Sequence, residues 1–239
     1  IIEDCRFEYS AGVAPNWYTG GVDVHFGKNW IVQDSIFEDI QSPEEAIAEH
    51  AIHFWSNSQG TSVRRNTIIN CDRGIGFGLG TSPHFEGTIW NNMIFHDGSG
   101  TYADVGIGIE SSTGTQILNN TVFLDHSRYA HAIEYRFSQT QNVHIANNLT
   151  NKRITSRDGG SALLEANINQ ALSSWFVQEW PGDLHLAGNI PEVVDQGVSI
   201  PGLNQDIDRD PRPLGIGIDI GADEYRPLVL PPCVHMLLL

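Results

Sequence analysis

Lysine, cysteine and basic charge are all scarce in this sequence. Lys28 and Lys152 are its only lysines, and 13 basic residues stand against 29 acidic ones, for a net charge of −16. Proteins bind the phosphates of nucleic acids and of anionic membranes mainly through Lys and Arg. The composition therefore argues against nucleic acid and anionic membranes as partners. It favours neutral ligands, cations, or anions bridged by a cation.

The three cysteines, Cys5, Cys71 and Cys233, form neither an even set nor a C-x-x-C pair. This pattern excludes a disulfide framework and the common cysteine-based zinc and redox motifs. Long apolar runs are also missing. The apolar tail at 227–239 is too short to cross a bilayer, so we expect no membrane span. No secretory signal peptide is recognisable in the sequence.

A segment of alternating apolar and polar residues recurs along the first two thirds of the chain. Its copies read IIEDCRFE from Ile1, IVQDSIFED from Ile31, VRRNTIINC from Val63, IWNNMIFHD from Ile89, ILNNTVFLD from Ile117 and IANNLTNK from Ile145. Successive copies begin 26 to 32 residues apart. A period in this range is typical of a solenoid, and the alternation is that of β-strands.

The fourth residue of each copy is Asp or Asn. The set is Asp4, Asp34, Asn66, Asn92, Asn120 and Asn148. Neighbouring coils of a β-solenoid lie about 4.8 Å apart, so these side chains should stack and hydrogen-bond along a column. Asn also tolerates the left-handed backbone of a sharp bend. The sequence therefore predicts a corner between strands in every coil, tied together by an Asn ladder.

A second set of strands is predicted from another recurring pattern. Its members are GVDVHF (21–26), HAIHFW (50–55), GIGFGL (74–79), DVGIGI (104–109), HAIEYRF (131–137) and SALLEA (161–166). Alternate large residues should fill the interior, and the residues between them should face outward. The predicted interior residues are Val22, Val24, Ile52, Phe54, Ile75, Phe77, Val105, Ile107, Ile133 and Tyr135.

Coils of this length, with an Asn corner and a G-[IV]-x-[IVF] strand, resemble the right-handed parallel β-helix of pectate-lyase type. The stretch DLHLAGNIPEVVDQGV…DIDRDPRPLGIGIDIGADEY (183–225) resembles the closing segment of many secreted bacterial β-helix proteins. The resemblance implies one all-β domain of about six coils over 1–190, with a closing segment over 191–226 and the tail over 227–239. It also implies an extracellular or cell-surface location. It does not fix the activity, because the fold hosts lyases, hydrolases, epimerases and adhesins.

Ile1 already lies inside a predicted coil. An open coil exposes unpaired backbone and an apolar interior. We therefore expect that further sequence covers this end, or that it pairs with a second copy of the chain in a homo-oligomer.

In β-helix enzymes the substrate usually lies across the outward face of one sheet, and the resemblance transfers this role to the second set of strands. Four glycines, Gly76, Gly78, Gly106 and Gly108, should leave a shallow patch there. Strand glycine often marks the close approach of a ligand. Trp55 is placed to stack on a sugar ring, and His131 flanks the patch. The alternative is that these glycines are a habit of β-helix strands and bind nothing.

Glu134 with Asp104 or Glu110 is the predicted acid–base pair of a glycoside hydrolase. These carboxylates lie one coil apart, whereas Asp23 lies four coils, about 19 Å, from Glu134, which is too far for a catalytic pair. Arg136 follows on the same strand as Glu134 and is suited to hold a sugar hydroxyl or carboxylate.

A polysaccharide lyase needs other groups. A cation must neutralise the uronate carboxylate, and a base must remove the neighbouring proton. Arg136 is the candidate cation, with bound Ca²⁺ as its alternative, and His53 or His131 is the candidate base. A glycan-binding or scaffold protein without catalysis is the third hypothesis.

Asp23, His25 and His53 are candidate ligands of a transition metal, because they fall at similar outward positions of adjacent coils. A second cluster provides candidate calcium ligands in Asp206, Asp208 and Asp210. The alternative for that cluster is ion pairing with Arg209 and Arg212, which would fasten the closing segment.

The segment QSPEEAIAEH (41–50) has the look of a helix start, with Ser42 before Pro43 and acidic residues in the first turn. We expect a short helical insertion that overhangs the outward face near His50 and His53.

Overall fold

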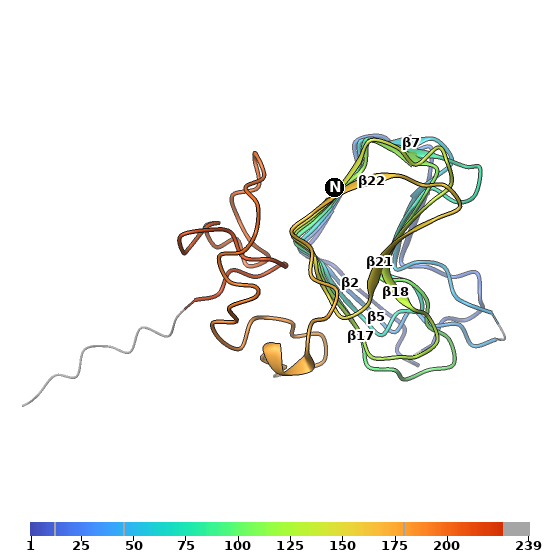
Figure 1. Cartoon of the computed structure of the whole chain (residues 1–239). Helices are drawn as coiled ribbons and strands as arrows, with labels where there is room; N and C mark the ends of the chain where they lie inside the picture. Colours follow the sequence, from blue (N-terminus) through green and yellow to red (C-terminus); the bar gives the residue numbers. More distant parts are fainter. Residues whose placement is uncertain (12, 45, 179, 227–239) are drawn as a thin grey trace, which may run out of the picture.

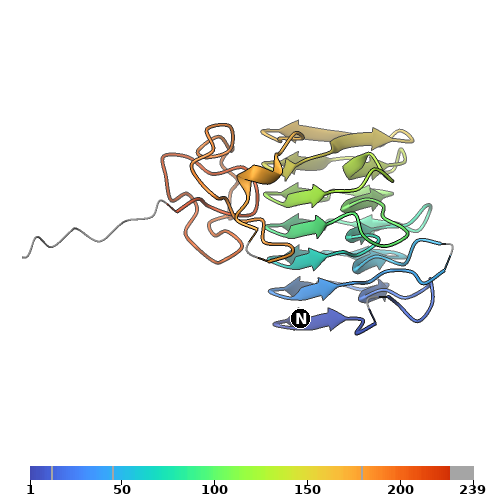
Figure 2. The same ribbon diagram turned by 90° about the horizontal axis from the view of Figure 1, so that it is seen from below.

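The computed structural model describes residues 1–226 except 12, 45 and 179, and its strands, from β1 to β22, form a parallel β-helix (Figure 1). Viewed along the axis, successive coils superimpose, and viewed from the side they stack as parallel strands (Figure 2). This confirms the all-β solenoid. Within the described residues, no helix is long and apolar enough to cross a membrane.

Three long sheets and one short one build the coils. The first sheet contains β1 (Ile2–Glu3), β4 (Ile31–Gln33), β8 (Ser62–Arg64), β12 (Thr88–Trp90), β16 (Gln116–Leu118), β19 (Val143–Ala146) and β22 (Ala162–Glu165). The second contains β2 (Arg6–Glu8), β5 (Ile36–Glu38), β9 (Thr67–Ile69), β13 (Met93–His96), β17 (Thr121–Leu124) and β20 (Leu149–Thr150). The third contains β3 (Val22–His25), β6 (Ile52–Trp55), β10 (Ile75–Phe77), β14 (Ile107–Glu110), β18 (His131–Arg136) and β21 (Arg153–Arg157). The short sheet contains β7 (Ser58–Gln59), β11 (His84–Phe85) and β15 (Ser112–Thr113).

Apolar residues of the three long sheets meet inside the coils. Each interior column repeats one position of the coil, as in the column Val32, Val63, Ile89, Ile117 and Ile145. The predicted interior residues of the third sheet are confirmed with one exception. Val105 precedes β14 and lines an outer cavity, and Ile109 takes its place in the column beside Phe77 and Tyr135. The prediction placed this strand two residues too early because the Gly–apolar alternation begins before β14.

The Asn ladder is confirmed, with a shift in the first two coils. Each side-chain Nδ2 donates to Oδ1 of the next Asn at 2.9–3.0 Å, through Asn66, Asn92, Asn120, Asn148 and Asn167. In the coils before Asn66, the ladder position is held by Ser35 and Cys5, not by Asp34 and Asp4. The two aspartates lie one residue earlier, at the bend.

The bend residue has a left-handed backbone in every coil of the ladder. Its occupants are Asp4, Asp34, Arg65, Asn91, Asn119, Asn147 and Ala166, with φ between 47° and 55°. The doubled Asn of the later coils therefore has two roles. The first Asn takes the strained turn, and the second carries the ladder.

The bend asparagines also hold the closing segment against the coils. Asn119 Nδ2 donates to the carbonyls of Asp219 and Gly221 at 3.1 and 3.3 Å. Asn147 exchanges side-chain hydrogen bonds of 2.8 Å with the backbone of Val198. Asn91 donates to the carbonyl of Gln205 at 2.6 Å. The segment thus lies along one flank of the helix (Figure 1).

One sequence-based assignment to the coils is wrong. SALLEA lies in the first sheet as β22, and the sixth strand of the third sheet is β21, whose sequence is RITSR. β21 has a single apolar residue, Ile154, so its alternation was too weak to be recognised. Regular strands end at β22, and the chain then forms the short 3-10 turn η1 (Ser173–Trp175), before the predicted boundary at residue 190.

The predicted helix at 41–50 is absent from the described residues of that segment. The amides of Ser42 and Ala48 both donate to Asp72 Oδ2 at 2.9 Å, so the neighbouring coil takes the place of a helical turn. The resulting loop still delivers Glu49 and His50 to the outer surface of the third sheet, beside His53.

Buried carboxylates organise the closing segment. Asp206 accepts the amides of Asp208, Asp210 and Glu224. The expected pairing of this cluster with its own arginines is wrong, because Arg209 pairs with Asp34 and Arg212 with Glu224. Asp208 pairs with His185, and Asp210 with Arg226. The calcium assignment stays a prediction, and the tail at 227–239 lies outside the described residues.

Candidate functional site

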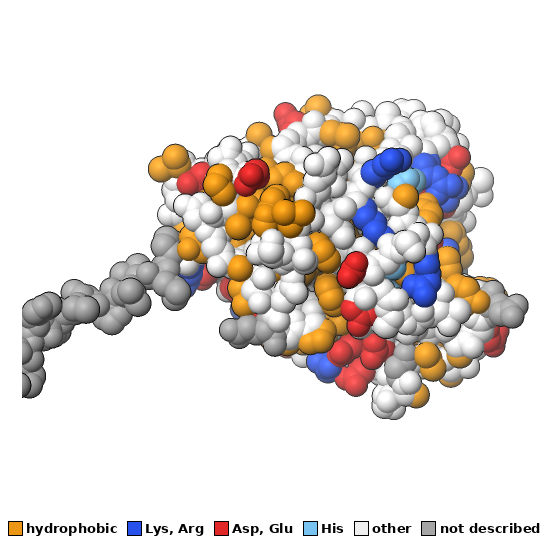
Figure 3. Space-filling model, turned by 60° about the horizontal axis from the view of Figure 1, so that its bottom comes forward, with side chains coloured by type: hydrophobic (Ala, Val, Ile, Leu, Met, Phe, Trp, Pro, Cys, Tyr) orange, Lys and Arg blue, Asp and Glu red, His pale blue; other side chains and the backbone are white. Residues whose placement is uncertain are grey.

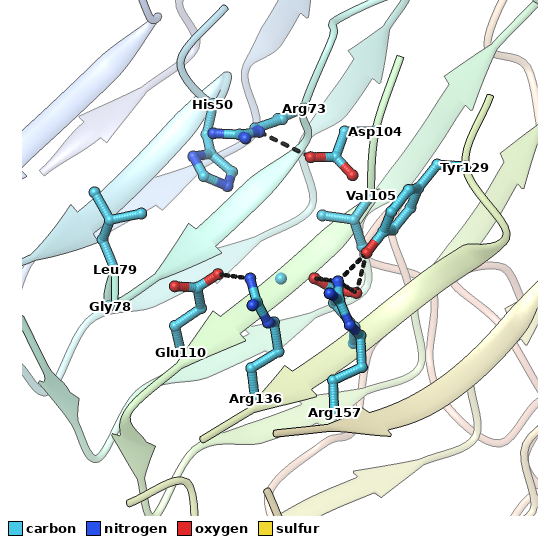
Figure 4. A pocket seen from close by; sticks show the side chains of 12 residues that line it. His50, Arg73, Gly78, Leu79, Asp104, Val105, Glu110, Tyr129, Arg136 and Arg157 are labelled. Atoms are coloured by element: carbon cyan, nitrogen blue, oxygen red, sulfur yellow. Dashed lines mark hydrogen bonds and ion pairs between the residues drawn. The ribbon is translucent and has the colours of Figure 1, made fainter. Parts of the chain in front are cut away.

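The outer surface of the third sheet carries a cavity of about 160 Å³ (Figure 4). It is lined by His50, Arg73, Gly78, Leu79, Asp104, Val105, Gly108, Glu110, Tyr129, Glu134, Arg136 and Arg157. Four of the five predicted catalytic residues are therefore brought together, and His53 is not among the described lining residues. Lys and Arg side chains gather on the half of the molecule away from the closing segment (Figure 3), although the chain as a whole is acidic.

Strand register places the cavity residues in two outward columns. Glu134 is level with Gly108 and Gly76. Two residues further along β18, Arg136 is level with Glu110 and Arg157. Neighbouring strands lie about 4.8 Å apart, so the glycines of the first column leave space beside Glu134, and the second column brings Glu110, Arg136 and Arg157 to its edge.

Two of the four predicted patch glycines have other roles. A Cβ on Gly106 would lie 2.5 Å from the Val122 side chain, so this residue faces packed interior and not the outer surface. A Cβ on Gly76 would lie 2.7 Å from the His50 ring. His50 therefore covers Gly76. Gly78 and Gly108 line the cavity, although a Cβ on Gly78, whose φ is +74°, would overlap the Glu110 carbonyl oxygen.

Glu134 is the most highly connected carboxylate of the cavity. Its side chain is 6% exposed. Oε2 accepts hydrogen bonds from the Tyr129 hydroxyl at 2.5 Å, from His131 Nδ1 at 3.1 Å and from Arg157 Nη1 at 3.1 Å. Burial raises the pKa of Glu134, but these three donors outweigh it and hold the pKa below its ordinary value. Glu134 is therefore an ionised base at neutral pH.

Asp104 has the opposite electrostatic environment. Its carboxylate pairs with Arg73 Nε at 3.0 Å. Burial raises its pKa above the ordinary value, with a further contribution from the charge of Glu134 and an opposing one from Arg73. Two carboxylates in one cavity with pKa values shifted apart are the usual arrangement of an acid and a base.

Arg136 and Glu110 form the opposite wall. Arg136 Nη1 donates to Glu110 Oε1 at 2.8 Å, and its Nε donates to Asp158 at 2.8 Å. Glu110 Oε2 also accepts the Gly80 amide at 2.6 Å. Arg136 and Arg157 come from neighbouring strands and extend side by side into the hollow (Figure 4). The Arg136 guanidinium is thus held in place with donor groups left for a ligand.

The other predicted residues, apart from His131, lie on β3 and β6, the first two strands of the third sheet along the chain. Trp55 Nε1 donates to Asp23 Oδ1 at 2.8 Å, and the His25 ring packs edge-on against Trp55. His53 is fully buried and stacks between Trp55 and His50. Asp23, His25 and His53 do not converge as a three-ligand set. His131, in contrast, contacts the cavity through Glu134.

The sequence reasoning missed Arg73, Tyr129 and Arg157. Arg157 was missed because β21 was not recognised as a strand of the third sheet. Tyr129 and Arg73 lie in the segments that lead into β18 and β10, where no periodicity specifies a direction. Tyr129 links the network, since its hydroxyl contacts both Glu134 and Arg157. Burial and the charge of Glu134 raise its pKa, so it remains a neutral donor.

Comparison of the chain with protein-family models, with curated protein sequences and with solved structures found no match.

Proposed function

We propose that this chain is a carbohydrate-binding β-helix protein whose cavity hydrolyses a glycosidic bond. Glu134 is the base or nucleophile and Asp104 the general acid. The observation that carries this proposal is that Glu134, held by three hydrogen-bond donors, and Asp104, paired with Arg73, line one cavity; the opposite directions of their pKa shifts support it. The resemblance to secreted bacterial β-helix proteins of pectate-lyase type supports it and extends the proposal to an extracellular location.

The volume of the cavity, about 160 Å³, limits what can enter it to at most one ring of a longer sugar chain. Trp55 follows Phe54 on β6, and Phe54 pairs with Phe77, the residue before Gly78. A polysaccharide that crosses the strands would therefore place one ring in the cavity and a later ring on the Trp55 indole.

Reducing-end release from a panel of neutral and uronic polysaccharides, with and without Ca²⁺, tests the proposal. Glu134→Gln should lower the rate by about 10²-fold or more, as expected for loss of an acid–base group. Asp104→Asn should act similarly. Glu165→Gln is the matched control, because Glu165 lies on β22 of the first sheet. Equal loss in all three variants, or none, would contradict the assignment.

A β-eliminating lyase is the second candidate, and the three cavity arginines favour it. Arg73, Arg136 and Arg157 would surround a uronate carboxylate in an otherwise acidic protein. His131 is the remaining candidate base, since His53 lies behind His50. Absorbance of an unsaturated product, abolished by Arg136→Ala, would identify this reaction. Binding without either product would identify a non-catalytic glycan-binding protein.

A further inference from the structure

A second cluster of chemically active side chains lies beside the cavity, at the beginning of β6. A carboxylate oxygen of Glu49 and one ring nitrogen each of His50 and His53 all lie within 4.8 Å of one another. His53 is 0% and His50 6% exposed, and the Glu49 side chain is 14% exposed. The proposed hydrolysis uses none of these three groups as acid or base.

The two imidazoles present unpartnered nitrogens to one carboxylate oxygen. Glu49 Oε2 lies 3.4 Å from His53 Nδ1 and 3.8 Å from His50 Nδ1. Both Nδ1 atoms are buried, and apart from these long contacts with the carboxylate they have no hydrogen-bond partner among the described residues. A buried polar atom left unsatisfied costs about 1–3 kcal/mol, and one ion bound beside Glu49 Oε2 would satisfy both nitrogens.

A tetrahedral metal ion accounts for both the spacing and the missing partners. Zinc bonds to nitrogen and oxygen are about 2.0–2.1 Å long, which places tetrahedral ligands about 3.3–3.4 Å apart. The 3.4 Å contact has this spacing, and metal binding would require His50 Nδ1 to move closer to Glu49 Oε2 than its present 3.8 Å.

The surrounding hydrogen bonds orient these groups as ligands. His53 Nε2 lies 3.2 Å from the Gly78 carbonyl, which can only accept. This contact assigns the ring proton to Nε2 and leaves a lone pair on Nδ1. Asp23 Oδ1 lies 3.6 Å from the same Nδ1 and is held by the Trp55 indole N–H. The Asp23 carboxylate therefore lies next to the Nδ1 atom of His53.

Gly76 provides the space that His50 needs. A Cβ there would lie 2.7–2.8 Å from three atoms of the His50 ring. Such contacts require the ring to move. The backbone of Gly76 is not in the left-handed region, so the close approach of His50, and not a turn, accounts for this glycine.

We propose that Glu49, His50 and His53 bind a divalent transition-metal ion of the Zn²⁺ class, with a fourth position directed toward Asp23. Two imidazoles and one carboxylate suit zinc, whereas Ca²⁺ and Mg²⁺ prefer six or more oxygen ligands. The ion would lock His50, whose ring forms one wall of the cavity. The site differs from the sequence-based set, because His25 is replaced by Glu49 and His50. It does not depend on the activity of the cavity.

Calorimetric titration of the chelator-treated chain with ZnCl₂, and separately with CaCl₂, tests the site. We expect one Zn²⁺ per chain, a raised melting temperature with Zn²⁺, and no comparable effect of Ca²⁺. Glu49→Gln keeps the side-chain shape and should weaken Zn²⁺ binding more than about 10-fold. Gly76→Ala should weaken it as well, by displacing His50, and provides a second variant should the first fail to fold.

Two control variants separate this site from its competitors. His25→Gln and Asp208→Asn should both bind Zn²⁺ like the original chain. Asp208 belongs to the other group of converging side chains, with His185 and Asp223. The proposal is overturned by a chain that does not bind Zn²⁺, by unchanged binding in folded Glu49→Gln, or by loss of binding in either control.

Discussion

The coils and the closing segment solve the same problem with different chemistry. Both bury backbone groups that need hydrogen-bond partners. In the coils, the partner is the neutral amide of the same residue one coil away, as in the step from Asn92 to Asn120. In the closing segment the partners are buried carboxylates, such as Asp219, which accepts the amides of Asp195 and Tyr225.

The difference follows from repetition. A repeated unit can use its neighbour as partner, so uncharged side chains suffice. An irregular segment has no copy of itself and must supply strong acceptors. Burying charge has a large desolvation cost unless a counter-charge is present. Arg212 provides it here, since its side chain is fully buried against Glu224 and donates to the carbonyls of Asp219 and Gly221.

Replacing Arg212 should have the largest effect on stability. Arg212→Met keeps the bulk but leaves Glu224 and the neighbouring aspartates without their cation. Breaking a buried ion pair in this way typically costs about 3–5 kcal/mol. We expect the closing segment to unfold at lower denaturant concentration than the coils, measured by urea titration. A single unshifted transition would show that Arg212 does not hold this segment.

Removing one ladder amide should destabilise the coils themselves. Asn120→Ala removes the acceptor of the Asn92 backbone N–H and the side-chain donor to the Ile89 carbonyl, and it leaves Asn148 Oδ1 with only the backbone N–H of residue 120. Each unsatisfied buried group costs about 1–3 kcal/mol. Because the neighbouring groups relax in part, we expect the free energy of unfolding to fall by about 3 kcal/mol. Urea unfolding followed by circular dichroism measures it. Asn169→Ala, at an exposed Asn, should be neutral.

The ladder also shows what could be predicted from the sequence. Its existence followed from the recurring Asn, because a polar residue that returns at one position inside apolar alternation can be satisfied by its own copy in the next coil. The register of the ladder in the first two coils could not be predicted in this way. Asp34 resembles Asn66 chemically, but in the structure it aligns with Arg65. Matching the buried Val32 to Val63 would have given the correct register.

Part of the candidate site could also be predicted, because alternation along a strand shows which side chains face outward. Glu134 and Arg136 lie on a strand with clear alternation, so their outward direction could be read. Arg73 and Tyr129 lie in segments without periodicity. Glu49 and His50 reach the third sheet because Asp72 shapes the loop before them, a contact between coils that no local pattern encodes.

The closing segment should lose stability as the pH rises, whereas the ladder has no group that titrates. A hydrogen bond to Asp208, together with one to Asp183 and against the effect of burial, raises the pKa of His185 to about 9. The folded chain therefore keeps a proton that the unfolded chain releases near pH 6.5. This contribution is complete below about pH 6.5 and is lost as the pH rises toward about 9.

Melting curves at about pH 6, 7.5 and 9 measure this effect, because they span the window between the unfolded and folded pKa values. The midpoint for the closing segment should fall with pH in the original chain and change less in His185→Gln. His144→Gln is the control, since His144 lies on β19 of the first sheet and pairs with Glu165 at the surface. An equal slope in His185→Gln would show that other groups set the pH dependence.

The smallest effect is expected from the exposed ion pair between the two regions. Arg209 donates to Asp34 at 2.9 Å, but its side chain is 56% exposed, and Asp34 keeps a second partner in Arg65. Exposed ion pairs contribute little, so Arg209→Gln should leave the melting midpoint unchanged within error. Asn147→Ala should lower it, because the side-chain bonds of Asn147 to Val198 are buried. The opposite ranking would mean that charge, and not the bend asparagines, docks the closing segment.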